Sequence, residues 1–184
     1  RALALCRGAG TQAELVRVVK GLWNVLLVRG ELVAARAMTD ELLRAAQESG
    51  DATLMLDAHA RLGQTAFHAG ELRAAHEHLE RASRMLHDTA ARSRHAGPRV
   101  VAYLSWVEWY LGHPERAAVH GREALERAAQ LGNAHSIAFT LGFIGWLHLF
   151  RGEAARAREL ANEQLALCAE HGLRYWQSWA TFLR

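Results

Sequence analysis

Hydrophobic and polar residues form a series of similar segments along this chain, each rich in Ala, Leu, Arg and Glu and each followed by a glycine. These residue types favour helices, and glycine is preferred just beyond a helix end because it adopts the left-handed conformation without steric penalty. The glycines, with one irregular interval, are Gly10, Gly30, Gly50, Gly70, Gly112, Gly132, Gly152 and Gly172. Each interval predicts one helix and a tight turn, and two intervals predict a hairpin of about forty residues.

The predicted fold is an all-α, right-handed superhelix of helical hairpins in a single repeat domain, residues 1–184. Residues 1–9 are expected to end a preceding helix. Hairpins are expected at about 12–49, 52–88, 98–131 and 134–171, followed by a partial helix at 174–184. Because the chain begins without methionine and ends inside a predicted helix, we expect it to be a fragment of a larger protein. The segment Asp88–Pro98 breaks the repeat, and it is interpreted either as an extended connection or as a hinge or partner contact.

Small residues flank the four inner turns at fixed distances and predict where the two helices of each hairpin touch. The fifth residue beyond each turn glycine is an alanine: Ala35, Ala75, Ala117 and Ala157. The seventh residue before each turn glycine is small in three of four cases: Trp23, Gly63, Ser105 and Gly145. Small side chains at paired positions let two helices approach closely, so we expect these positions to meet.

This arrangement resembles the tetratricopeptide repeat, whose pattern has a small residue in the first helix, a glycine at the turn and small residues in the second helix. The best match is Leu62-Gly63 with Gly70, Ala75, Leu79 and Ala82. The period is longer than usual, and the first-helix tryptophan of the family is replaced by Val19, His59, Val101 and Leu141. The stretches LLVRGELVAAR from Leu26, LGHPERA from Leu111 and the closing HGLRYWQSWATFLR are similar to the C-terminal repeats of bacterial cyclase and kinase-cyclase fusions that carry an ATPase module.

Composition and charge exclude several classes of function. The net charge is +3, and arginines are interleaved with glutamates, which is typical of solvated helix faces and not of a nucleic-acid surface. No apolar run reaches the roughly 20 residues of a membrane span, and the N-terminus is unlike a signal peptide, so we expect a soluble cytoplasmic protein. Cys6 and Cys168 occupy equivalent places in separated repeats, so we expect no disulfide.

Catalytic and metal-binding motifs are not found, which predicts a protein that is not an enzyme and needs no cofactor. There is no phosphate-binding glycine loop, no GxSxG elbow and no HExxH pair. The closest metal candidate is His76-Glu77-His78. Residues two apart on a helix point about 200° from one another, so the two imidazoles are not expected to share an ion.

The resemblance implies that first helices line a concave groove, with the exposed positions two, three and six residues before each turn glycine. On this basis the predicted partner-binding groove comprises Phe67, His68, Trp106, Trp109, Tyr110, Trp146, Phe150 and Trp179. A large exposed aromatic patch is typical of a binding site. The alternative interpretation is that these rings are packed in the core or covered by further repeats.

Two functions follow from this pattern. The first is a non-catalytic interaction module or scaffold of a bacterial signalling protein, which binds a partner peptide, a partner protein or another domain of the same polypeptide in the aromatic groove. The second is a sensor domain for a small molecule such as a sugar, within a signalling ATPase or transcription regulator. Self-association through the uncapped C-terminal end is a further expectation, because aromatic residues crowd the last helix.

Overall fold

The computed structural model describes residues 12–88 and 96–184, and the ordered elements in these ranges are all helices. The helices are α2 (Gln12–Val28), α3 (Leu32–Ser49), α4 (Ala52–His68), α5 (Leu72–Asp88), α6 (Gly97–Tyr110), α7 (Pro114–Leu131), α8 (Ala134–Phe150), α9 (Ala154–His171) and α10 (Arg174–Leu183). The predicted all-α hairpin fold is confirmed. The helix expected before Gly10 and most of the Asp88–Pro98 segment lie outside the described residues.

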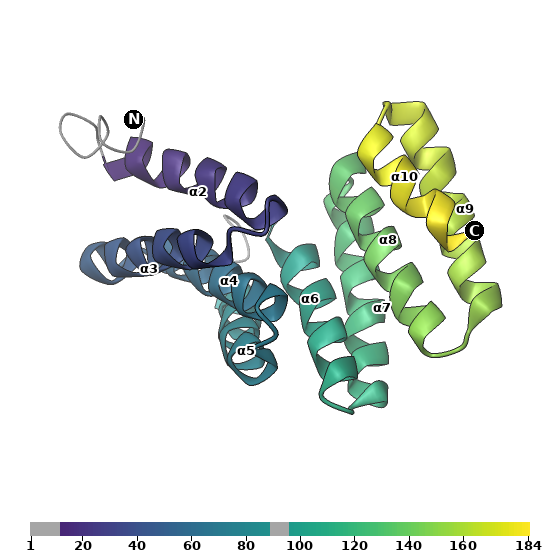
Figure 1. Ribbon diagram of the computed structural model, residues 1–184, viewed down its shortest axis with the longest axis horizontal. Helices are drawn as coiled ribbons and strands as arrows, with labels where there is room; N and C mark the ends of the chain where they lie inside the picture. The colour runs from purple at the N-terminus through teal and green to yellow at the C-terminus, as the bar shows by residue number, and fades with distance from the viewer. Residues whose placement is uncertain (1–11, 89–95) are drawn as a thin grey trace. The chain divides into compact units, whose positions relative to one another are not determined.

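The chain separates into two compact units, the first ending at Met85 and the second beginning at Leu86. In the first unit α2 lies beside α3, and α3 lies beside α4 (Figure 1). In the second unit α6 pairs with α7, α8 pairs with α9, and α10 packs against both α8 and α9. That the two units continue one right-handed superhelix within a single domain stays a prediction.

The inner turns of the four hairpins share one geometry. Gly30, Gly70, Gly112 and Gly152 have φ angles of 74°, 77°, 85° and 76°, the left-handed region that favours glycine. After each glycine, the next backbone N–H donates a 2.9 Å hydrogen bond to a carbonyl five residues earlier, as Glu71 does to Ala66. This bond satisfies a carbonyl that the helix end would otherwise leave unpaired, so each turn closes its first helix and starts the second.

Close helix contacts occur where the small residues predicted them. A Cβ atom on Gly63 would lie 2.5 Å from Cγ of Leu79 and 3.2 Å from the carbonyl oxygen of Ala75. A Cβ atom on Gly145 would lie 3.9 Å from the carbonyl oxygen of Ala157. The alanines at the matching second-helix positions are all buried: Ala35, Ala75, Ala117 and Ala157. The predicted pairing is therefore confirmed for the hairpins of Gly63 and Gly145.

Polar contacts hold part of the first unit together. Trp23 stands where the other hairpins have a small residue, and its buried Nε1 donates a 2.9 Å hydrogen bond to Oγ1 of Thr65. The guanidinium of Arg61 lies over the same indole, 4.5 Å from the ring centroid. The bulk of Trp23 is thus accommodated by specific partners on α4.

Two further observations bear on the sequence predictions. Within the described ranges, none of the helices combines the length and the apolar character that a bilayer span requires. Cys168 is buried with a free thiol, and burial raises its pKa. Cys6 lies outside the described residues, so the absence of a disulfide between Cys6 and Cys168 stays a prediction.

Candidate aromatic binding site

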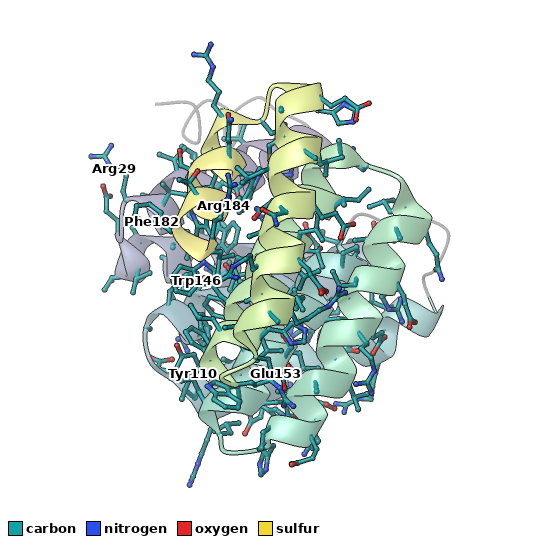
Figure 2. The ribbon with its side chains drawn as sticks, turned by 90° about the vertical axis from the view of Figure 1, so that its right-hand side faces the viewer. Arg29, Tyr110, Trp146, Glu153, Phe182 and Arg184 are labelled. Atoms are coloured by element: carbon teal, nitrogen blue, oxygen red, sulfur yellow. The ribbon has the colours of Figure 1, made fainter. Side chains whose placement is uncertain are left out.

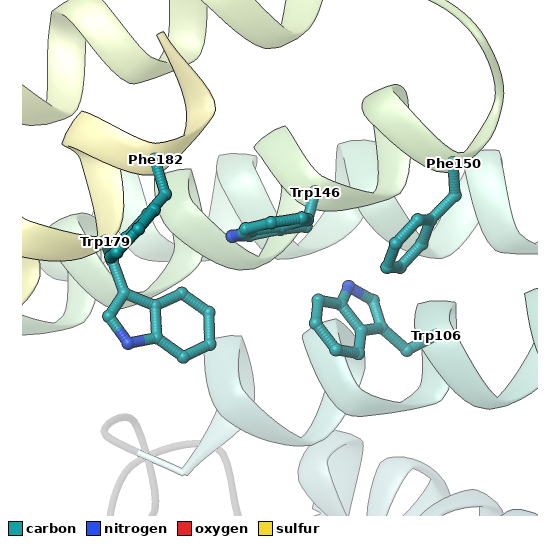
Figure 3. A pocket seen from close by; sticks show the side chains of 5 residues that line it. All are labelled: Trp106, Trp146, Phe150, Trp179 and Phe182. Carbon is teal, nitrogen blue, oxygen red and sulfur yellow. The ribbon is translucent and has the colours of Figure 1, made fainter.

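Five aromatic side chains surround one hollow of about 320 Å³ in the second unit. They come from α6, α8 and α10, the first helices of successive hairpins, and are Trp106, Trp146, Phe150, Trp179 and Phe182. Figure 3 shows Trp179 and Phe182 on one side, Trp106 and Phe150 on the other, and Trp146 between them. We call this the aromatic hollow. Its composition follows from three helices that each present rings on the same side of the unit.

A stripe of rings along α8 explains how one helix reaches both the core and the hollow. Phe139, Phe143, Trp146 and Phe150 follow one another at intervals of four, three and four residues, which places them on one face of a helix. Phe139 and Phe143 are buried, whereas Trp146 and Phe150 are partly exposed. The stripe therefore runs from the core toward the surface.

Phe143 is the centre of the aromatic packing behind the hollow. Its ring stacks on Trp179 at 5.7 Å with an interplanar angle of 5°, and it lies 4.9 Å from Tyr103 and 4.3 Å from Phe139. Burial raises the pKa of the Tyr103 hydroxyl, as expected in this apolar surrounding. The rings that form the back wall are fixed from several sides, so the wall of the hollow is preformed.

Trp106 belongs to the core and to the hollow at the same time. Its indole stacks on Phe143 at 4.6 Å and meets Phe150 edge-on at 5.5 Å. Its Nε1 donates a 2.8 Å hydrogen bond to the carbonyl oxygen of Phe143. The residue is half-buried, so the groove and core interpretations of the sequence each describe one part of its side chain.

Trp146 and Trp179 keep their indole N–H donors available. Among the described residues, neither indole has a hydrogen-bond partner, and the ring of Trp146 lies beside that of Phe150, with the ring centroids 6.0 Å apart. The three tryptophans that line the hollow make no ring contact with one another, so open space remains between their faces. A ligand in the hollow would meet three indole rings and two N–H donors.

The turn beside Phe150 is held by polar contacts. Arg151 donates a 2.7 Å hydrogen bond from Nη1 to the carbonyl oxygen of Pro114 and a 2.8 Å bond from Nε to Glu153. The Glu153 carboxylate also pairs with Nδ1 of His148, and these hydrogen bonds lower its pKa. Phe150 is the last residue of α8, so these contacts fix the rim of the hollow.

The eight predicted groove residues fall into three groups: four line the hollow, two lie elsewhere in the second unit, and two lie in the first unit. Trp106, Trp146, Phe150 and Trp179 line the aromatic hollow. Tyr110 is 51% exposed, with its ring 6.1 Å from Phe150, and Figure 2 shows Tyr110, Trp146 and Phe182 along one side of the second unit. Trp109 is half-buried and does not line the hollow.

The last two predicted groove residues, Phe67 and His68, belong to the first unit. Their rings lie next to each other, with centroids 5.3 Å apart in an edge-on arrangement. They are not part of the aromatic hollow. Whether any of the eight predicted residues contacts a partner stays a prediction.

The sequence pattern did not identify Phe143 as a packing centre, and Phe182 was not among the eight predicted groove residues. The predicted positions were counted back from a turn glycine, and α10 has no such glycine after it in this chain. The signal for Phe143 is present, because it fills the gap in the four-three-four stripe along α8.

The histidine cluster on α5 has a partner on the neighbouring helix. Nδ1 of His78 lies 3.0 Å from Nδ1 of His59 on α4, with the ring centroids 5.3 Å apart. Burial, aided by His78 and Arg81, lowers the pKa of His59 to about 4, and burial and Arg81 also lower that of His78. Both rings are therefore neutral near pH 7, and one donates a hydrogen bond to the other.

No protein-family model and no curated protein match this sequence. Several solved structures are similar to this chain. BtubC (BKLC) from P. vanneervenii is similar with a TM-score of 0.71 and 21% identity, over 92% of this chain and 68% of that one. A kinesin-light-chain protein of P. anserina with TPR-like repeats gives 0.66 and 16%, over 88% and 78%. A Rap protein complexed with Competence and Sporulation Factor gives 0.72 and 13%, over 92% and 52%.

At these identities the likeness establishes the fold, and the fold is a tetratricopeptide-like array of helical hairpins. The resemblance to the repeats of bacterial cyclase and kinase-cyclase fusions stays a prediction.

Proposed function

We propose that this chain is a non-catalytic protein-interaction module, and that the aromatic hollow anchors a side chain of its partner. One observation carries the proposal: five aromatic side chains from three first helices gather around a single open hollow. Aromatic clusters of this kind dominate binding energy at protein interfaces because a large apolar area is buried with little loss of side-chain entropy. The partner is a peptide or protein segment, or another domain of the same polypeptide.

Preorganisation supports this assignment. The back wall of the hollow is stacked on buried Phe143, and its rim is tied by Arg151 and Glu153. Binding sites that are ordered before the partner arrives lose less entropy on association. Phe182 and Tyr110 at the edge are 82% and 51% exposed, so they can bury further area when a partner covers them.

Structural likeness gives a second line of support. One of the similar solved structures is a Rap protein complexed with Competence and Sporulation Factor, so a protein with similar hairpins over about half of its chain forms a complex with such a factor. By analogy, we place the present chain in a bacterial signalling protein of the cytoplasm, as part of a longer polypeptide.

The small-molecule sensor is the second candidate. A hollow of about 320 Å³ lies at the lower end of the usual range for small-molecule sites. Such sites combine apolar walls with a few convergent polar groups, and a sugar in particular needs several. The hollow offers two free indole N–H donors and no charged side chain among its five lining residues, so a side chain of a partner fits better.

Selection from a displayed random-peptide library tests the proposal. The wild-type protein should enrich peptides that share an anchor residue, and the variant Trp146→Ala/Phe182→Ala should not retain them. Tyr175→Ala is the matched control, because Tyr175 is a 60% exposed aromatic residue on α10 outside the hollow. Enrichment that is equal on the double variant and the wild type would refute the assignment of the site.

A further inference from the structure

The walls of the aromatic hollow continue an aromatic part of the core. Much of the interior of α6 and α8 is aliphatic, but the buried rings of Tyr103, Phe139 and Phe143 lie together behind the hollow. All five residues around the hollow are aromatic. Rings bury apolar area as aliphatic side chains do, and in addition their faces carry an electrostatic potential that aliphatic side chains lack.

Aromatic faces carry negative electrostatic potential and attract cations within about 6 Å of the ring centre, tryptophan most strongly. This chain places cations on rings elsewhere: the guanidinium of Arg61 lies 4.5 Å from the Trp23 ring, and that of Arg99 lies 4.8 Å from Phe139. The hollow contains three tryptophans, and none of its five described lining residues is a cation. The faces of these rings therefore favour a cationic ligand.

The kind of cation follows from the hydrogen-bonding groups. An ammonium or guanidinium group brings N–H donors that need acceptors when water is removed. The five lining side chains offer two free N–H donors and no carboxylate or carbonyl acceptor of their own. A quaternary ammonium has no N–H group and is weakly hydrated, so it brings no donor that the lining side chains would have to satisfy.

We propose that the aromatic hollow binds a trimethylammonium group, carried by a trimethylated lysine of the partner. The inference rests on the proposed function, because it names the anchor residue that the partner inserts. The positive group lies among the faces of Trp106, Trp146 and Trp179, and the apolar stem of the lysine lies along exposed Phe182 at the rim.

The test compares two probes of the same shape. One is N-acetyl trimethyl-lysine amide, and the other is its neutral analogue with carbon in place of nitrogen, which ends in a tert-butyl group. Titrations are followed through the indole N–H signals of Trp146 and Trp179 in NMR spectra. We expect the charged probe to bind about tenfold more tightly than the neutral one. Equal binding of the two, or tighter binding of the neutral one, would overturn the inference while leaving the apolar anchor of the proposed function intact.

Substitutions distinguish the contribution of the indole face from that of the side-chain volume. Trp146→Leu keeps an apolar side chain but removes the indole face, and Trp146 is partly exposed with no hydrogen-bond partner among the described residues. It should weaken the charged probe about tenfold and leave the neutral probe nearly unchanged, while Tyr175→Leu should affect neither. Undiminished binding of the charged probe to Trp146→Leu would contradict the inference.

Choline and phosphatidylcholine vesicles test the source of the group. Vesicle binding without binding of the lysine probe would overturn the assignment to a partner lysine. If neither lysine probe binds, the inference fails, and the peptide selection decides the proposed function independently.

Discussion

The two units of this protein build the same hairpins and use one repeat position in opposite ways. Six residues before the turn glycine, the first unit has Asn24, which is exposed, and Gln64, which is buried and donates a 3.0 Å hydrogen bond to the carbonyl of Ala60. The second unit has Trp106 and Trp146 at this position, and both line the aromatic hollow. The backbone repeat thus sets the location of a surface, and single side chains decide whether it becomes a binding site.

The interiors of the two units also differ, in the kind of contact that joins their helices. The first unit joins α2 to α4 through the Trp23–Thr65 hydrogen bond and α4 to α5 through the His59–His78 pair. The second unit joins α6, α8 and α10 through stacked rings centred on Phe143. Directional polar contacts in one unit and aromatic packing in the other predict different responses to mutation and to pH.

The largest effect is expected from Phe143→Ala. Truncating a buried aromatic residue costs about 3 to 5 kcal/mol, because a cavity remains where several rings were packed. The loss should be confined to the second unit, so hydrogen exchange should accelerate in α6, α8 and α10 and stay unchanged in α2 to α4. Urea unfolding gives the magnitude, with Phe143→Leu as a milder control. Equal acceleration in both units would show that they do not unfold separately.

Larger side chains at the hairpin contacts should destabilise the unit in which they are placed. Ala75→Leu in the first unit and Ala117→Leu in the second should each lower the free energy of unfolding by about 1 to 3 kcal/mol, since both alanines are fully buried. Ala155→Leu, at an exposed position of α9, is the matched control and should change it little. An unchanged urea midpoint in both buried variants would remove the contact role assigned to these alanines.

The residues that were predictable from the sequence are those that the backbone itself demands. Gly70 and Gly152 must adopt positive φ, and Gly63 and Gly145 must admit a neighbouring helix, so their spacing alone revealed the turns and the close contacts. Trp146 and Phe150 lie four residues apart on one helix, and their shared face was equally visible in the sequence.

Other features depend on how separate helices meet, which no spacing along the chain specifies. Trp106 and Trp109 differ by three residues and therefore point about 60° apart, and only Trp106 reaches the hollow. Phe182 lines the hollow because α10 packs against α8, and the His59–His78 pair forms across two helices. The sequence could predict a groove on the first helices, but not which rings converge there.

Acidification should weaken the first unit through its histidine pair. The pKa of His59 is about 4 in the folded protein, against 6.5 for a free histidine, so the unfolded chain binds more protons between these values. Stability is complete above about pH 6.5 and declines as the pH falls toward 4. The charged neighbours of His78 are Arg81, Arg36, Glu77 and Asp40.

Urea midpoints between pH 7.5 and 4.5, followed by the indole NMR signal of Trp23, measure this decline in the first unit. The variant His59→Asn removes one of the two titrations and should show a shallower decline than the wild type. A wild-type midpoint that does not change over this range would contradict the neutral, buried pair.

Binding by Trp146 tests the central claim most directly. A peptide enriched by the wild-type protein is titrated calorimetrically into Trp146→Ala, and urea unfolding of the same variant is measured alongside Trp106→Ala. We predict that Trp146→Ala weakens binding by about 2 kcal/mol or more and costs less stability than Trp106→Ala, which also loses the hydrogen bond to Phe143. A folded Trp146→Ala protein that binds the peptide as tightly as the wild type would contradict the account.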